Sequence, residues 1–165
     1  MKAGMRQMSQ LTAVVSVGLV LVLAGTALAQ SSNPHIGNWK LNIAKSKYNA
    51  GTPPKSTTIK QESSGAGVKV TVDSVSAVGT VTHYTFATNY DGKDSPITGN
   101  NSNGDTAVVT RPDANTTRTV YKMGGNITVT NTAVVSGDGK TRTITSKGTN
   151  SLGQTVDSVA VYDKQ

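Results

Sequence analysis

The feature that most constrains the fold is an alternation of apolar and polar residues that recurs from Gly37 to the C-terminus. A period of two residues is that of a β-strand, in which successive side chains point to opposite faces. The alternating segments are rich in Val, Ile, Thr and Tyr, and short stretches of Gly, Asn, Asp and Ser separate them. The strands that we predict are 37–42, 56–62, 68–74, 80–88, 93–98, 105–111, 116–122, 126–135, 140–147 and 155–163.

The connections between these segments favour hairpins. Asp91-Gly92, Gly124-Gly125, Asp138-Gly139 and Leu152-Gly153 supply residues that accept positive φ between neighbouring strands. Only the connection 43–55 is longer, and it has room for one short turn of 3₁₀ helix. Because an open sheet of this size leaves two edges unpaired, the sequence predicts an all-β fold, an antiparallel up-and-down meander of about 8–10 strands closed into a barrel with little or no helix.

The alternation also predicts which side chains point into the barrel. Trp39 and Leu41 share one face of the first strand, and the valines of strand 68–74 share one face of theirs. Strands 80–88 and 116–122 carry mixed residues on both faces, so the inward side of these two strands stays open.

The N-terminus has the layout of a cleavable secretory signal. Lys2 and Arg6 precede an apolar run over 11–24, and small residues lead up to Ala29. We therefore expect a signal peptide over 1–29, a flexible N-terminus over 30–36 and a single barrel domain over 37–165. The run is shorter than the roughly 20 residues of a membrane-spanning helix. We expect an exported protein, periplasmic or extracellular, with no membrane span after cleavage.

A Gly-x-Trp step, Gly37-Asn38-Trp39, followed by a β-meander resembles the calycin group, which comprises lipocalins and fatty-acid-binding proteins. Val161-Tyr162-Asp163-Lys164 is similar to the last strand of fatty-acid-binding proteins. The resemblance implies a lipocalin-like barrel around a small apolar or amphiphilic ligand. Two features depart from it: the connection 43–55 is too short for a helical lid, and Ala160 stands where those proteins carry an arginine that anchors carboxylates.

The chain more closely resembles a set of uncharacterised exported bacterial proteins. The shared features are the Trp-Lys-Leu-Asn start at 39–42, the Lys-Ser-Lys-Tyr step at 45–48 and the Gly-Pro loop at 51–54. This resemblance implies no particular activity.

Two arginines are candidate ligand anchors. Arg118 shares a strand face with Val120, and Arg142 shares one with Ile144, so both guanidinium groups are predicted to point inward. They would bind a carboxylate bidentately and replace the anchor missing at Ala160. The alternative is that Tyr121, Met123 and the threonines face inward and both arginines lie in solvent.

Aromatic residues supply the remaining candidates. Four of them are predicted to line a ligand pocket: Tyr84, Phe86, Tyr121 and Tyr162. Gly37 and Trp39 are predicted to form the structural base of the barrel, since packing explains Trp39 better than a ligand contact does. Lys45, Lys47 and Tyr48 either close the barrel mouth or form a solvated loop.

Catalysis, metal binding and cofactor binding have little support. His35 and His83 are far apart in sequence, neither has a recognisable catalytic partner, and the chain has no Cys. The net charge of +7 is scattered and lacks interleaved aromatics, so we expect no nucleic acid partner. Most aspartates fall in or beside turns, where turn chemistry accounts for them.

We therefore expect a non-catalytic, monomeric, exported protein that binds a small hydrophobic or amphiphilic molecule inside the barrel. The alternative is a structural or interaction protein whose barrel is filled by its own side chains and which contacts another macromolecule. Cavity volume separates the two hypotheses. A ligand site should be on the order of 300 Å³ or larger with apolar walls, whereas a filled barrel leaves no continuous space.

Overall fold

The structure is a computed structural model that describes residues 33–165. The predicted signal peptide, residues 1–29, lies outside the described residues. The described part is all β, with no helix, as the sequence predicts. The strands are β1 Gly37–Tyr48, β2 Ser56–Ser64, β3 Gly67–Val75, β4 Val81–Thr88, β5 Asp91–Pro96, β6 Thr98–Gly99, β7 Thr106–Thr110, β8 Thr116–Met123, β9 Asn126–Val135, β10 Thr141–Thr149 and β11 Thr155–Lys164.

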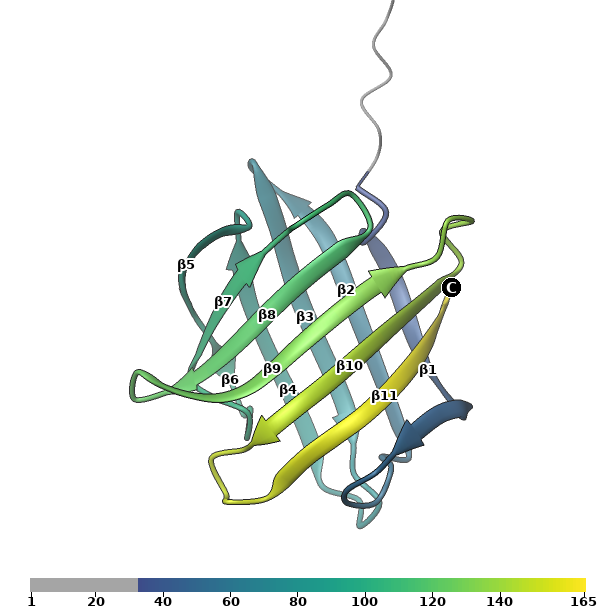
Figure 1. The fold of residues 1–165 in the computed structure, drawn as a ribbon, viewed down its shortest axis with the longest axis vertical. Coiled ribbons are helices and arrows are strands. Elements are labelled where there is room, and N and C mark those ends of the chain that lie inside the picture. The colour runs from purple at the N-terminus through teal and green to yellow at the C-terminus, as the bar shows by residue number, and fades with distance from the viewer. Residues whose placement is uncertain (1–32) are drawn as a thin grey trace, which may run out of the picture. The chain divides into compact units, whose positions relative to one another are not determined.

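The strands form one antiparallel sheet that curls into a nearly closed barrel (Figure 1). The sheet order is β5-β7-β8-β9-β10-β11-β1-β2-β3-β4-β6, so most neighbours in sequence are neighbours in space. The expected strand 93–98 is interrupted at Ile97: β5 pairs with β7, whereas β6 pairs with β4. One short segment therefore joins the two margins of the sheet, and the prediction of an up-and-down barrel is confirmed.

The connection 43–55 differs from the prediction because β1 continues to Tyr48 instead of ending at Asn42. The β1–β11 register shifts between Asn42 and Lys47, which marks a bulge, and no 3₁₀ turn follows it. A bulge lets a strand bend and resume pairing with the same neighbour, so the segment gains strand hydrogen bonds that a loop would lack.

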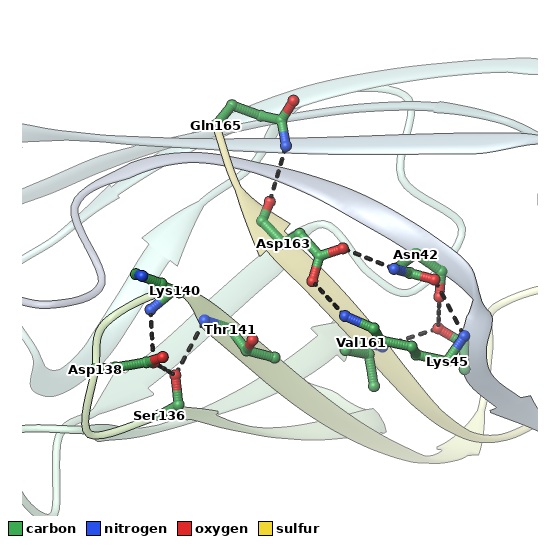
Figure 2. Close-up of polar contacts among 10 residues, drawn as sticks. Asn42, Lys45, Ser136, Asp138, Lys140, Thr141, Val161, Asp163 and Gln165 are labelled. Atoms are coloured by element: carbon green, nitrogen blue, oxygen red, sulfur yellow. Dashed lines mark hydrogen bonds and ion pairs between the residues drawn. The ribbon is translucent and has the colours of Figure 1, made fainter.

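Side chains on the outer surface hold this bulge (Figure 2). Asn42 Nδ2 donates to Asp163 Oδ2 at 2.7 Å, and Lys45 Nζ lies 3.3 Å from Asp163 Oδ1. Ser46 Oγ donates to the Asn42 carbonyl oxygen and accepts a hydrogen bond from Val161 N at 2.9 Å. The Lys-Ser-Lys-Tyr step therefore has a structural explanation, in which Lys45 and Ser46 tie β1 to β11.

One end of the barrel, here called the closed end, is covered by residues 33–36 and Trp39. Trp39 is fully buried, and its Nε1 donates to the His35 carbonyl oxygen at 2.9 Å. Lys164 Nζ lies 5.0 Å from the centre of the Trp39 ring, within the range of a cation–π contact. Trp39 therefore packs at the end of the barrel.

Gly37 has a backbone conformation that other residues rarely adopt. Its φ is 135°, and a Cβ atom at this position would approach Lys164 Cε to 2.6 Å. The Gly-x-Trp step thus combines a glycine with positive φ and a fully buried indole. No helix among residues 33–165 is long and apolar enough to cross a membrane.

Candidate functional site

The barrel encloses a cavity of about 270 Å³. We call the end opposite Trp39 the mouth, because there Pro54 and Asn101–Asn103, from the connections between strands, join the cavity wall. This volume is slightly below the size expected for a ligand site, and the walls are more polar than expected. The space is nevertheless continuous, so the interior is not completely filled by its own side chains.

The first level of the cavity, nearest the mouth, is polar. Thr119, Asn131, Ser146 and Ser158 lie opposite one another on β8 to β11, and all four line the cavity. Thr57, Ser74 and Thr82 form a similar row across β2 to β4. The Thr57 and Ser74 hydroxyl oxygens are 2.8 Å apart. We call these two rows the polar ring.

The second level, two residues deeper on each strand, is apolar. It consists of one row on β9 to β11 and one on β2 to β4, made of Ala133, Ile144, Ala160, Ile59, Val72 and Tyr84. All six are buried. We call this level the apolar belt; it is the part of the wall suited to a hydrocarbon group.

The third level contains a buried arginine. Arg142 on β10 lies opposite Val135 and Tyr162, lines the cavity and is 5% exposed. Its Nε and Nη1 are buried and have no hydrogen-bond partner. Among residues 33–165 no carboxylate forms an ion pair with it. Burial lowers the pKa of Arg142, but a guanidinium group remains protonated in proteins.

Tyrosines surround this guanidinium. Tyr84, Tyr121 and Tyr162 line the cavity with Arg142, and the Tyr84 and Tyr121 hydroxyl oxygens are 3.3 Å apart. Burial raises the pKa of all three phenols, so they are neutral at pH 7 and do not neutralise the arginine. Phe86 is buried beside them, with its ring stacked on Tyr84 at 6.5 Å between centres.

His35 is a buried polar group that sequence reasoning missed. It is fully buried, and neither ring nitrogen has a hydrogen-bond partner. Burial, with Arg142 and Arg111 nearby, lowers the pKa of His35 to about 4, so its ring is neutral at pH 7. Of the segment 30–36 only 33–36 is described, and this part packs against the barrel.

Arg118 is not part of the site, so the prediction that it points inward is wrong. On β8 the buried residues are Thr117 and Tyr121, whereas Arg118 is exposed. The alternative interpretation, with threonines and Tyr121 facing inward, holds for this strand, although Met123 lies at its exposed end. A small hydroxyl side chain fits the crowded interior at less cost than a second unpaired guanidinium group.

The inward face of strand 80–88 is also resolved. Tyr84, Phe86 and Thr88 are buried, and His83 is on the outer face, where its Nδ1 lies 2.6 Å from Asp73 Oδ1. The cavity therefore brings together Tyr84, Phe86, Tyr121, Arg142 and Tyr162 of the predicted ligand residues and leaves out Arg118.

Three residues near the mouth are now placed. Lys45 is exposed and pairs with Asp163 on the outer surface, and Lys47 is exposed as well. Tyr48 is half-buried and lines the cavity. Only the tyrosine of the Lys-Ser-Lys-Tyr step therefore contributes to the wall.

Two amides of the cavity wall were also missed. Gln61 Oε1 and Asn131 Oδ1 are buried acceptors with no hydrogen-bond partner. The alternation carried a signal for both, since Gln61 shares a strand face with Ile59, and Asn131 shares one with Val129. A polar residue on an apolar face marks a position where the interior is polar.

Among residues 33–165 no three His, Asp or Glu side chains come together to hold a metal ion. Comparison of the chain with protein-family models, curated proteins and solved structures gives no match.

Proposed function

We propose that the protein is an exported, non-catalytic, lipocalin-like binder that holds a small amphiphilic anion inside its barrel. In this account residues 1–29 direct export to the periplasm or beyond the cell, and the exported chain acts as a monomer. The proposal is supported by the cavity, and Arg142 is the observation that carries it.

A buried cation without a counterion is expensive. Transferring an ion into a protein interior costs several kcal/mol even after relaxation, and a charge in such a place is normally paired. Arg142 is 5% exposed, and two of its nitrogens have no partner. A carboxylate that accepts two parallel hydrogen bonds from the guanidinium group would remove this cost.

The levels of the wall fit an amphiphile. The apolar belt lies between the arginine and the polar ring, so the hydrocarbon part of a bound molecule would contact Ile59, Ile144 and Ala160. Arg142 would then perform the role of the arginine that fatty-acid-binding proteins carry at the position of Ala160. It does so from the neighbouring strand, because Arg142 lies opposite Tyr162 on β11.

Titration calorimetry of the purified protein with benzoate and hexanoate tests this proposal. We expect wild type to bind at least one of these carboxylates and Arg142→Gln to bind it about tenfold or more weakly, because a charge-assisted bidentate contact is lost. Arg118→Gln is the matched control: it removes an arginine from the outer face and should leave the affinity unchanged.

Equal carboxylate binding by all three proteins would contradict the proposal, because the anion would then not contact Arg142. No carboxylate binding by wild type, together with a mass that shows no bound molecule, would also contradict it. That result would favour the interaction protein with a filled barrel.

A further inference from the structure

The order of polar and apolar levels in the cavity specifies a ligand class. We infer that the ligand is a hydroxylated carboxylate, in which a compact apolar group, such as one aromatic ring, separates the carboxylate from a hydroxyl group. The carboxylate contacts Arg142 and the hydroxyl contacts Asn131. The inference rests on the proposed function and extends it from an amphiphilic anion to a molecule with defined polar groups at both ends.

The first argument is the unpartnered acceptor at the polar ring. Asn131 Oδ1 is buried, lines the cavity and accepts no hydrogen bond. A buried acceptor without a donor costs about 1–3 kcal/mol, so a bound hydroxyl group that donates to it would be favourable. An alkyl chain at this place would leave the acceptor unpaired. Asn131 therefore favours a hydroxylated ligand over a purely hydrocarbon one.

The neighbours of Asn131 support a polar end of the ligand. Thr119 lies opposite it on β8 and Ser146 lies opposite it on β10, and both line the cavity. Their hydroxyl groups both donate and accept, so a ligand hydroxyl bound at Asn131 has further hydrogen-bond partners within the same row. At the other end of the molecule, Arg142 offers donors only, which fits a carboxylate.

The second argument is the separation of the two polar groups. Arg142 lies opposite Val135 on β9, and Asn131 is four residues from Val135 on the same strand. At about 3.3 Å per residue this is about 13 Å of backbone. The long arginine side chain occupies part of that length. One ring bearing substituents at opposite ends suits the remainder, with its faces against the apolar belt.

The third argument is volume. An apolar cavity of about 150 Å³ holds one benzene molecule. The cavity of about 270 Å³ therefore suits a molecule about twice the size of benzene. A long-chain fatty acid is much larger, so this barrel selects small ligands over the lipids that a calycin resemblance suggests.

A matched set of probes tests the inference by titration calorimetry on the purified protein. Para-hydroxybenzoate carries both polar groups, benzoate lacks the hydroxyl, para-cresol lacks the carboxylate, and palmitate exceeds the cavity. We expect para-hydroxybenzoate to bind most tightly, benzoate about tenfold more weakly, and para-cresol and palmitate about a hundredfold more weakly or not at all.

A variant of Asn131 identifies the hydroxyl contact. Asn131→Leu replaces the amide with an apolar group of similar size, so it should bind para-hydroxybenzoate and benzoate with equal affinity. Thr132→Val changes the adjacent side chain, which faces away from the cavity, and should keep the tenfold preference. A thermal unfolding curve for each variant verifies that the barrel is folded.

The outcomes separate this inference from the proposed function. If binding depends on Arg142 but benzoate binds as tightly as para-hydroxybenzoate, or palmitate binds most tightly, the inference is overturned and the proposed function stands. If Asn131→Leu keeps the tenfold preference, the assigned contact is wrong and the inference fails. If no probe shows binding that depends on Arg142, both fail.

Discussion

The two ends of the barrel treat their polar side chains in opposite ways. At the mouth, the Thr57 and Ser74 hydroxyl groups bond to each other, and the Asn150 side chain and backbone bond to Gln154. Towards the closed end, His35 and Arg142 are buried with nitrogens that have no partner. Satisfied polar groups stabilise a turn or a row of strands, whereas unsatisfied ones mark a place that another molecule completes. The difference indicates that the deep part of the cavity carries the functional demand.

The largest effect on stability is expected at the closed end. Trp39→Ala should lower the free energy of unfolding by about 3–5 kcal/mol, because it leaves a cavity where a fully buried indole packs. Leu152→Ala changes a 70% exposed side chain in the β10–β11 turn and should alter it by less than about 0.5 kcal/mol. Urea denaturation of both variants measures the contrast, and similar losses would contradict it.

Acid should weaken the closed end through His35. Its folded pKa of about 4 lies below the model value of 6.5, so the unfolded state binds the extra proton between these pH values. This contribution to stability is complete above about pH 6.5, is lost as the pH falls to about 4, and amounts to about 2–3 kcal/mol. Arg142 and Arg111 disfavour the protonated ring, and only Asp113 favours it.

Urea denaturation between pH 7 and pH 4 checks this dependence. His35→Gln should remove most of it, whereas His83→Gln, on the exposed outer face, should keep it. Asp113 and Asp163 have lowered pKa values, so their own contributions are lost only at a more acidic pH. A wild-type stability that is constant across this window would contradict the prediction.

The unliganded protein should gain stability when Arg142 is removed. Arg142→Leu replaces an unpaired buried charge with an apolar group, and we expect the free energy of unfolding to rise by about 1–3 kcal/mol. Arg118→Leu, on the outer face, should change it by less than about 0.5 kcal/mol. A large loss of stability in Arg142→Leu would mean that the arginine serves the fold instead of a ligand.

The smallest effect is expected from the surface contacts of the β1 bulge. Asn42→Ala removes one hydrogen bond to Asp163, and because the contact is partly solvated we expect a loss of about 0.5–1 kcal/mol. Lys45→Ala removes an exposed ion pair and should cost still less. Thermal unfolding measures both, and a loss as large as that of Trp39→Ala would contradict the account.

The sequence predicted the barrel because the alternation and the turn residues are local signals. Strand 126–135 matches β9 at both ends, and the inward position of Trp39 follows from period two. The extension of β1 to Tyr48 was missed, since a bulge interrupts the alternation that marks a strand.

The site was less predictable than the fold. Arg118 and Arg142 have the same local pattern, each two residues before an apolar side chain, yet one is exposed and the other buried. Local alternation does not say which face of a mixed strand turns inward, because that depends on the strands packed beside it. The burial of His35 depends on contacts between the chain start and the barrel, which no local pattern reports.

Native mass spectrometry of the protein purified from its own host tests the central claim most directly. Wild type and Arg118→Leu should each carry one bound carboxylic acid that is released on denaturation, and Arg142→Leu should carry none. If all three proteins show the mass of the bare chain, or all three retain the same bound molecule, Arg142 is not the anchor of a ligand and the account is wrong.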